Sequence, residues 1–145
     1  DFTACLGFEV EGTDENLTDL DVDSFQKMIA KAVAAYPNFK ATATTLRGVR
    51  TATVNDWGAM CWVDGEFYTA THHPGLEIMD RVGGGDSFAS GLIPGLSLYY
   101  DRQTELDLSV AASCHKHSIS GDFNRVSKAE VQHLMSGDAS GRVQR

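Results

Sequence analysis

Three consecutive glycines at Gly83–Gly85, followed by an aspartate and an apolar run, constrain this chain more than any other stretch. Glycine frees the backbone for tight turns and for close approach to a ligand. The small and apolar residues from Phe88 to Leu98 predict a helix that begins at Asp86 or just before it. Such a turn presents unpaired amides at a helix N-terminus, where both the amides and the helix dipole favour a phosphate group.

Asp86 is unusual in this position, because its carboxylate would repel a bound anion. It is compatible with an anion site if it takes a proton from a substrate or holds a cation. The other interpretation is structural, with Asp86 capping the helix after a glycine turn. The motif alone leaves both interpretations open.

The composition predicts one compact domain, since 145 residues with 42% hydrophobic and 22% charged residues can bury a core of ordinary size. The net charge of −8 and the scattered lysines and arginines argue against nucleic acid and anionic membranes as partners. No apolar run reaches the roughly 20 residues of a membrane span, and no signal peptide is recognisable, so we expect a cytoplasmic protein. Cys5, Cys61 and Cys114 stand in apolar contexts and are expected to be buried, reduced thiols.

Hydrophobic spacing predicts helices and strands in an order typical of a layered α/β domain with helices covering a buried sheet. Helices are expected at the N-terminus as far as Gly7, at 24–36, from about Thr104 to His117, and from near Ser127. Strands are expected at 39–46, 49–54, 58–63 and 66–71, the last two joined by a hairpin turn at Asp64–Gly65.

Three further local features carry expectations of their own. Ser127 and Glu130 have the spacing of a capping box. Pro94 is expected to bend the helix after the glycines, because it removes one hydrogen bond at a cost of about 3 kcal/mol. The acidic stretch from Glu9 to Asp23, with seven carboxylates, is most simply a solvated loop, and the polar tail 137–145 is expected to be poorly ordered.

Several common site types do not fit the sequence. There is no GxxxxGK[ST] motif, no GxGxxG at the glycine turn and no GxSxG elbow around Ser87 or Ser90, which argues against a P-loop, a Rossmann cofactor site and a serine nucleophile. The tract Cys114–His117 lacks a second pair of metal ligands at suitable spacing, and adjacent helical positions point in different directions. His72 and His73 are expected to end a strand.

The glycine stretch from Asp80 to Gly91 resembles the second signature of the ribokinase-like (PfkB) carbohydrate kinases, usually D-T-x-G-A-G-D-x-F-x-x-G. Within that family the likeness is greatest to 2-keto-3-deoxygluconate kinases. Three further stretches carry this narrower resemblance: 44–57, 116–124 and 141–145. The resemblance covers essentially the whole chain and implies the C-terminal portion of a layered α/β/α ribokinase-like fold, with a sheet flanked by helices.

The resemblance implies roles for the glycine turn. The aspartate that matches Asp86 is the general base, which takes the proton from the sugar hydroxyl as that hydroxyl attacks the γ-phosphate of ATP. The amides that match Gly83, Gly84 and Gly85 form an anion hole for the charge on the transferred group. Both roles are physically reasonable, because phosphoryl transfer depends mainly on positioning and on electrostatic stabilisation.

The resemblance also implies nucleotide contacts outside the turn. Residues that match Thr45, Arg47 and Gly48 would line the nucleotide at a strand end, and the loop from Gly121 to Asn124 would lie near the adenine. Arg47 replaces the glycine usual in the family, as it often does in keto-deoxygluconate kinases. The implied substrates are ATP, with Mg²⁺, and a small sugar acid.

The resemblance is to the C-terminal half of such kinases only, so we expect 1–145 to be a single domain with the catalytic base and much of the ATP site. The family's N-x-x-E motif for Mg²⁺, its lid and most of its sugar contacts fall in the other half, and no metal ligand is assigned in this chain. A nucleotide-binding half-domain without turnover is the alternative, and a capped turn of purely structural function is a third interpretation. A truncated sheet would expose an apolar edge, which predicts a homo-oligomer.

Overall fold

The computed structural model of the chain describes residues 2–10, 22–97 and 101–136. Most of the predicted acidic loop and the predicted C-terminal tail lie outside these residues. In the part that is described, helices and strands follow in this order: α1 (Phe2–Leu6), α2 (Val22–Ala35), β1 (Ala41–Val49), β2 (Val54–Val63), β3 (Glu66–Thr69), β4 (His73–Glu77), α3 (Gly84–Ser97), α4 (Arg102–His117) and α5 (Lys128–Met135). None of these helices is long and apolar enough to cross a membrane.

The strands form one antiparallel sheet with β2 at its centre. β1 pairs with one edge of β2 over its whole length, while β3 and β4 pair with β2 in succession, β3 at Met60–Val63 and β4 at Val54–Trp57. The predicted hairpin at Asp64–Gly65 is confirmed. Both turn residues have positive φ, 49° and 101°, as a two-residue type I′ turn requires.

The predicted strand at 49–54 is wrong, because residues 50–53 form the turn between β1 and β2. The Thr51 hydroxyl accepts hydrogen bonds from the amides of Thr53 and Val54, at 3.3 and 3.0 Å, and so competes with strand pairing. β1 therefore ends at Val49, and β2 begins at Val54. The expected strand end at His72–His73 is also wrong, because β4 begins at His73.

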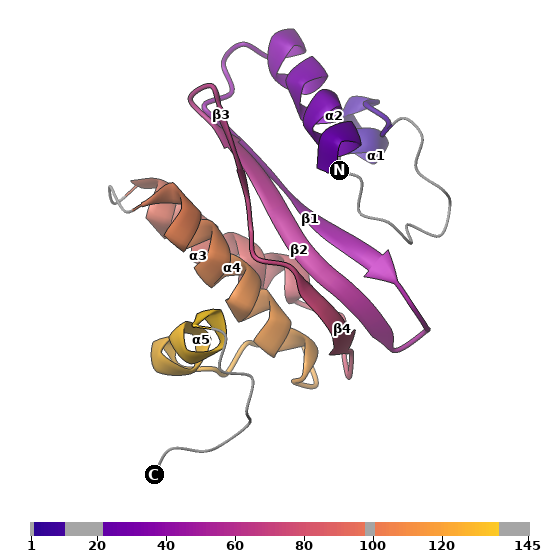
Figure 1. The fold of residues 1–145 in the computed structure, drawn as a ribbon, viewed down its shortest axis with the longest axis vertical. Coiled ribbons are helices and arrows are strands. Elements are labelled where there is room, and N and C mark those ends of the chain that lie inside the picture. The colour runs from indigo at the N-terminus through magenta and orange to yellow at the C-terminus, as the bar shows by residue number, and fades with distance from the viewer. Residues whose placement is uncertain (1, 11–21, 98–100, 137–145) are drawn as a thin grey trace.

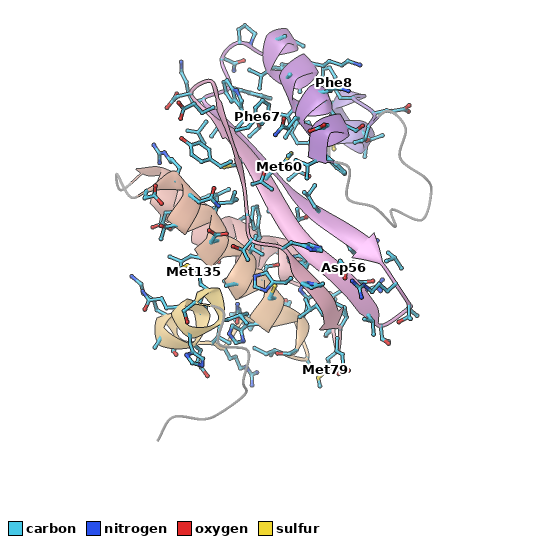
Figure 2. The ribbon with its side chains drawn as sticks, viewed as in Figure 1. Phe8, Asp56, Met60, Phe67, Met79 and Met135 are labelled. Carbon is cyan, nitrogen blue, oxygen red and sulfur yellow. The ribbon has the colours of Figure 1, made fainter. Side chains whose placement is uncertain are left out.

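The two faces of the sheet are covered by different helices, as Figure 1 shows. On one face, alternate residues of β2 pack with α3 and α4 in a core of Trp57, Ala59, Cys61, Val63, Phe88, Leu92, Leu106, Val110 and Cys114. On the other face, Met60 packs with Met28 and Ile29 of α2, and Phe67 adds to this cluster; Figure 2 labels Met60 and Phe67 on the side of the sheet that α2 covers. The layered α/β architecture with a sheet flanked by helices is thus confirmed.

The helix ends largely agree with the sequence. α3 begins at Gly84, two residues before Asp86, and continues through Pro94; the bend expected there stays a prediction. Asp101 caps α4, and the predicted capping box at Ser127 and Glu130 is present at the start of α5.

Two of the three cysteines are buried as expected, and the third is not. Burial raises the pKa of the Cys61 thiol to about 11 and that of the Cys114 thiol to about 12, so both stay protonated and unreactive. Cys5 is exposed, which corrects the expectation for that residue. No residue of its helix, α1, is buried.

Helices α3 and α4 approach most closely at Gly91, and this contact generates a stability prediction. A Cβ atom at Gly91 would lie 2.9 Å from the Cα of Ser109, a backbone atom that cannot rotate away. We expect Gly91→Ala to lower the free energy of unfolding by about 1–3 kcal/mol through overpacking, despite the better helix propensity of alanine. Urea titration followed by circular dichroism measures this loss.

The matched control is Gly85→Ala in the same helix, where an added Cβ meets nothing within 4 Å and the φ angle is not positive. Its unfolding midpoint should stay unchanged or rise. A Gly91→Ala protein as stable as the Gly85→Ala protein would contradict the packing described for α3 and α4.

Candidate active site

Two of the three glycines of the turn are required by contacts with the end of α4 and the loop after it. Gly83 has a φ of +78°, and a Cβ there would collide with the backbone carbonyl of Asp122. A Cβ at Gly84 would lie 2.9 Å from Nε2 of His117. Gly85 faces open space. The turn thus requires glycine at positions 83 and 84 for close approach, whereas the space in front of Gly85 is free.

The turn leaves amides free at the N-terminus of α3. The Gly84 amide donates to the Arg81 carbonyl at 3.3 Å, and the Ser87 amide donates to the Gly83 carbonyl at 2.9 Å. The amides of Gly85 and Asp86 have no acceptor among the described residues, as expected for the first turn of a helix. The Gly83 amide also has no acceptor among the described residues, so of the three glycines only Gly84 has its amide engaged.

Asp86 does not cap the helix. It is the third residue of α3, and its carboxylate is exposed and accepts no hydrogen bond from any described residue. The capping interpretation of Asp86 is therefore wrong, because the chain already becomes helical at Gly84. An exposed carboxylate that accepts no hydrogen bond from the described residues is available for proton transfer.

A pocket of about 80 Å³ lies where the glycine turn meets the sheet and the end of α4. Its lining comes from β1, β2, the loop before α3, the start of α3 and the end of α4: Arg47, Asn55, Trp57, Arg81, Gly84, Gly85 and His117. Two of these side chains are guanidinium groups, and none of the lining residues is a carboxylate. The pocket is therefore electropositive in a protein whose net charge is −8.

Strand register and one hydrogen bond bring the two arginines to the pocket. Arg47 of β1 lies directly opposite Trp57 of β2 in the antiparallel pair. Arg81 donates from Nη2 to the carbonyl of Ala52 at 2.6 Å, which ties the loop before α3 to the turn between β1 and β2. The pocket is thus built from segments far apart in the sequence.

Asp80 fixes the start of the glycine turn against the loop after α4. Its carboxylate accepts hydrogen bonds from the amides of Val82, at 3.0 Å, and Gly121, at 2.7 Å. These bonds hold the pKa of Asp80 below its usual value, so the carboxylate stays ionised. Asp80 is therefore a structural anchor of the glycine turn.

His117 fills the space behind the glycine turn. Its Nδ1 lies 2.7 Å from the Ser113 carbonyl, which can only accept, so Nδ1 carries the proton and Nε2 faces Gly84. The ring also contacts Trp57, with centroids 4.4 Å apart. Burial is the main cause that lowers the pKa of His117, and the nearby positive charges of Lys116, Arg81 and Arg47 lower it further. The ring is neutral near pH 7.

Only some of the residues expected at a nucleotide site line this pocket. Arg47, Gly84 and Gly85 do, whereas Gly83 does not, and Thr45 and Gly48 lie in β1 outside it. The Asn124 side chain is fully engaged elsewhere, because Nδ2 donates to Ser87 Oγ and to the Ala112 carbonyl, and Oδ1 accepts from the Val126 amide. The structure therefore shows Asn124 as a clamp between α3, α4 and the following loop.

Sequence reasoning missed four residues of the pocket: Asn55, Trp57, Arg81 and His117. Asn55 and Trp57 are alternate residues of a strand, and Trp57 lies opposite Arg47, so alternation could have signalled that these three residues share a face of the sheet. For His117 the sequence pattern allows only a metal ligand to be considered, within the tract 114–117, and argues against it. In the structure that tract divides, with Cys114 in the core, His115 near the Glu130 carbonyl and His117 at the pocket.

In comparisons with known proteins, the chain matches solved structures only. No protein-family model matches the chain, and no curated protein matches it significantly in sequence. A crystal structure of 2-dehydro-3-deoxygluconokinase from Thermotoga maritima is 39% identical over 91% of this chain, with a TM-score of 0.80. A PfkB family carbohydrate kinase from Listeria grayi is 27% identical over 79% of this chain, with a TM-score of 0.69.

A third structure, from Enterococcus faecalis, matches all of this chain with a TM-score of 0.77 but only 21% identity, and so supports the fold alone. The chain spans 38% of the length of the first of these proteins and 35% of the second. It is therefore related in sequence and in fold to the PfkB-family carbohydrate kinases, 2-dehydro-3-deoxygluconokinase among them, over somewhat more than a third of their length.

Proposed function

We propose that this chain is the C-terminal, nucleotide-binding and catalytic-base part of an ATP-dependent carbohydrate kinase. The reaction is transfer of the γ-phosphoryl group of ATP to a hydroxyl group of 2-keto-3-deoxygluconate. The observation that carries this proposal is the exposed Asp86 carboxylate beside free amides and a pocket with two arginines. The similarity to a 2-dehydro-3-deoxygluconokinase supports the choice of substrate.

In the proposed reaction, Asp86 accepts the proton of the sugar hydroxyl while the hydroxyl oxygen forms a bond to the γ-phosphorus. The bond from that phosphorus to the bridging oxygen of ADP breaks, and ADP leaves. The free amides of Gly85 and Asp86 donate to the oxygens of the transferred group, and Arg47 and Arg81 balance its charge. Removing one donor of this kind typically costs about 10²–10³ in rate.

The donors of the pocket fit phosphate groups, but the described residues do not form a site for Mg²⁺. No group of three histidine, cysteine or acidic side chains is close enough together among them to hold a metal ion. We therefore assign no residue of this chain to Mg²⁺, which would reach the site with the ATP phosphates.

A nucleotide-binding half-domain without turnover is the second candidate. It corresponds to the part of the related kinases that the chain matches, 38% and 35% of their length. We also propose that 1–145 forms a single domain. We further propose that it self-associates, because β1 pairs only with β2 among the described strands and leaves its other edge open. We keep cytoplasmic location as a further proposal.

Binding of ADP tests whether the nucleotide site is present. We expect saturable binding of ADP in calorimetric titration, and we expect Arg47→Gln to weaken it about tenfold, or about 1.4 kcal/mol, because a charged donor to phosphate is lost. Lys27→Gln is the matched control, since it removes one positive charge from an exposed position of α2, on the other side of the sheet. Equal weakening by both substitutions would show a general charge effect and contradict the assignment of Arg47.

Substitution of Asp86 tests the chemistry separately from binding. With ATP and 2-keto-3-deoxygluconate as substrates, Asp86→Asn should lower the rate of phosphoryl transfer by about 10²- to 10⁴-fold, because the base is lost while its shape is kept. ADP affinity should change little. Asp64→Asn is the control, since asparagine suits the positive φ of that turn equally well.

The two candidates predict different outcomes for the unsubstituted chain. Turnover that depends on Asp86 supports the kinase. ADP binding with no turnover in either protein supports the half-domain, and a rate that is unchanged by Asp86→Asn would rule out Asp86 as the base.

A further inference from the structure

Asn55 is the residue of the pocket that the fold itself does not explain. Its side chain is 0% exposed, yet neither Nδ2 nor Oδ1 has a hydrogen-bond partner within the described part of the chain. The indole Nε1 of Trp57, two residues further along β2, is also buried without a partner there. Buried polar atoms are nearly always hydrogen-bonded, so three unsatisfied atoms at one place call for a specific cause.

The two residues that carry these atoms line the same pocket. Asn55 and Trp57 are alternate residues of β2 and therefore point to the same face of the sheet, where both line the pocket. The pairing of β2 with β4 changes register between these two residues, with the extra residue in β4, while β2 stays in regular register with β1. Glycine-turn residues Gly84 and Gly85 complete the lining.

The chemistry of the unsatisfied atoms restricts the ligand. Arg47, Arg81, the Gly85 amide, Trp57 Nε1 and Asn55 Nδ2 can only donate hydrogen bonds, which suits the oxygens of an anion. Asn55 Oδ1 can only accept, and a fully deprotonated oxyanion has no proton to give it. The ligand that satisfies all of these atoms combines an oxyanion with a hydroxyl group.

We infer that Asn55 and Trp57 make this pocket selective for an oxyanion that carries a hydroxyl proton. In this arrangement Trp57 Nε1 and Asn55 Nδ2 donate to ligand oxygens, and Asn55 Oδ1 accepts from the ligand hydroxyl. Two sources have this chemistry: a hydroxy acid such as a sugar acid, and a monohydrogen phosphate group. The inference rests on the proposed function, since it assigns the ligand chemistry of the same pocket.

The substitution Asn55→Leu separates binding from structure. It replaces the unsatisfied amide by an apolar group of similar size, which should raise the unfolding midpoint of the ligand-free protein. The same substitution should weaken the binding of gluconate, of monohydrogen phosphate, or of both, by about tenfold. Sulfate and acetate carry no hydroxyl proton, so they should bind the unsubstituted protein more weakly than gluconate and phosphate. Their affinity should fall little further in Asn55→Leu.

Two further variants keep the test decisive. Trp57→Phe preserves most of the ring and removes only the Nε1 donor, so it gives the binding result if Asn55→Leu fails to fold. Thr42→Val is the matched control, because Thr42 Oγ1 is also buried without a partner among the described residues but lies outside the pocket. This control should leave the affinity for every probe unchanged.

Calorimetric titration with the four anions and with ADP distinguishes the outcomes. Loss of gluconate binding in Asn55→Leu identifies the sugar acid as the source, and loss of phosphate binding identifies the phosphate. Equal affinity of the unsubstituted protein for sulfate and phosphate, or unchanged affinities in Asn55→Leu and Trp57→Phe, would overturn the inference. If ADP still binds in that case, the proposed function survives, whereas absence of all binding would remove both.

Discussion

The candidate site depends on the close approach of the glycine turn to the end of α4. Gly83 meets the Asp122 backbone and Gly84 meets the His117 ring at distances that exclude any side chain. Four hydrogen bonds among the described residues hold the contact. Ser113 Oγ donates to the Gly84 carbonyl, the amides of Met79 and Asp80 both donate to the His117 carbonyl, and the Gly121 amide donates to the Asp80 carboxylate. Because this contact fixes where α3 begins, it also fixes the direction of the free amides and of Asp86.

The second constraint is the turn between β1 and β2, which supports the site from the sheet. Arg81 donates a hydrogen bond to the carbonyl of Ala52 in this turn. Arg50 forms an ion pair with Asp56, with 2.6 Å between Nε and Oδ1, and the Asp56 carboxylate also accepts a hydrogen bond from the Gly75 amide of β4. Figure 2 labels Asp56 toward the end of β2 where this turn lies. The sheet thus provides a braced edge for the pocket, while the glycine contact with α4 closes it from the other side.

Much of this arrangement could be predicted from the sequence where the signal is local. The glycine turn before a helix, the hairpin at Asp64–Gly65 and the capping box at Ser127 depend on neighbouring residues, and each is present. The turn at 50–53 resembles a strand in sequence because β-branched residues favour strands. The hydrogen bonds that the Thr51 hydroxyl accepts determine the turn, and residue type alone does not reveal them. The pocket residues Asn55, Trp57 and His117 come together only through strand register and helix packing, which no local spacing encodes.

The charges and hydrogen-bond donors of the site are arranged for an anion rather than for the stability of the free protein. Arg47 and Arg81 line the pocket without a carboxylate beside them, and the amides that start α3 lack acceptors among the described residues. His117 adds no charge, since burial lowers its pKa and its Nδ1 proton is committed to the Ser113 carbonyl. Arg47, Arg81, Gly85 and Asp86 are exposed, so water can solvate these groups in the ligand-free protein, and an anion that enters the pocket would take the place of that water. Asp86 is exposed at the rim of this positive region, where its carboxylate is close enough to the start of α3 to be favoured by the helix dipole and yet free to take a proton.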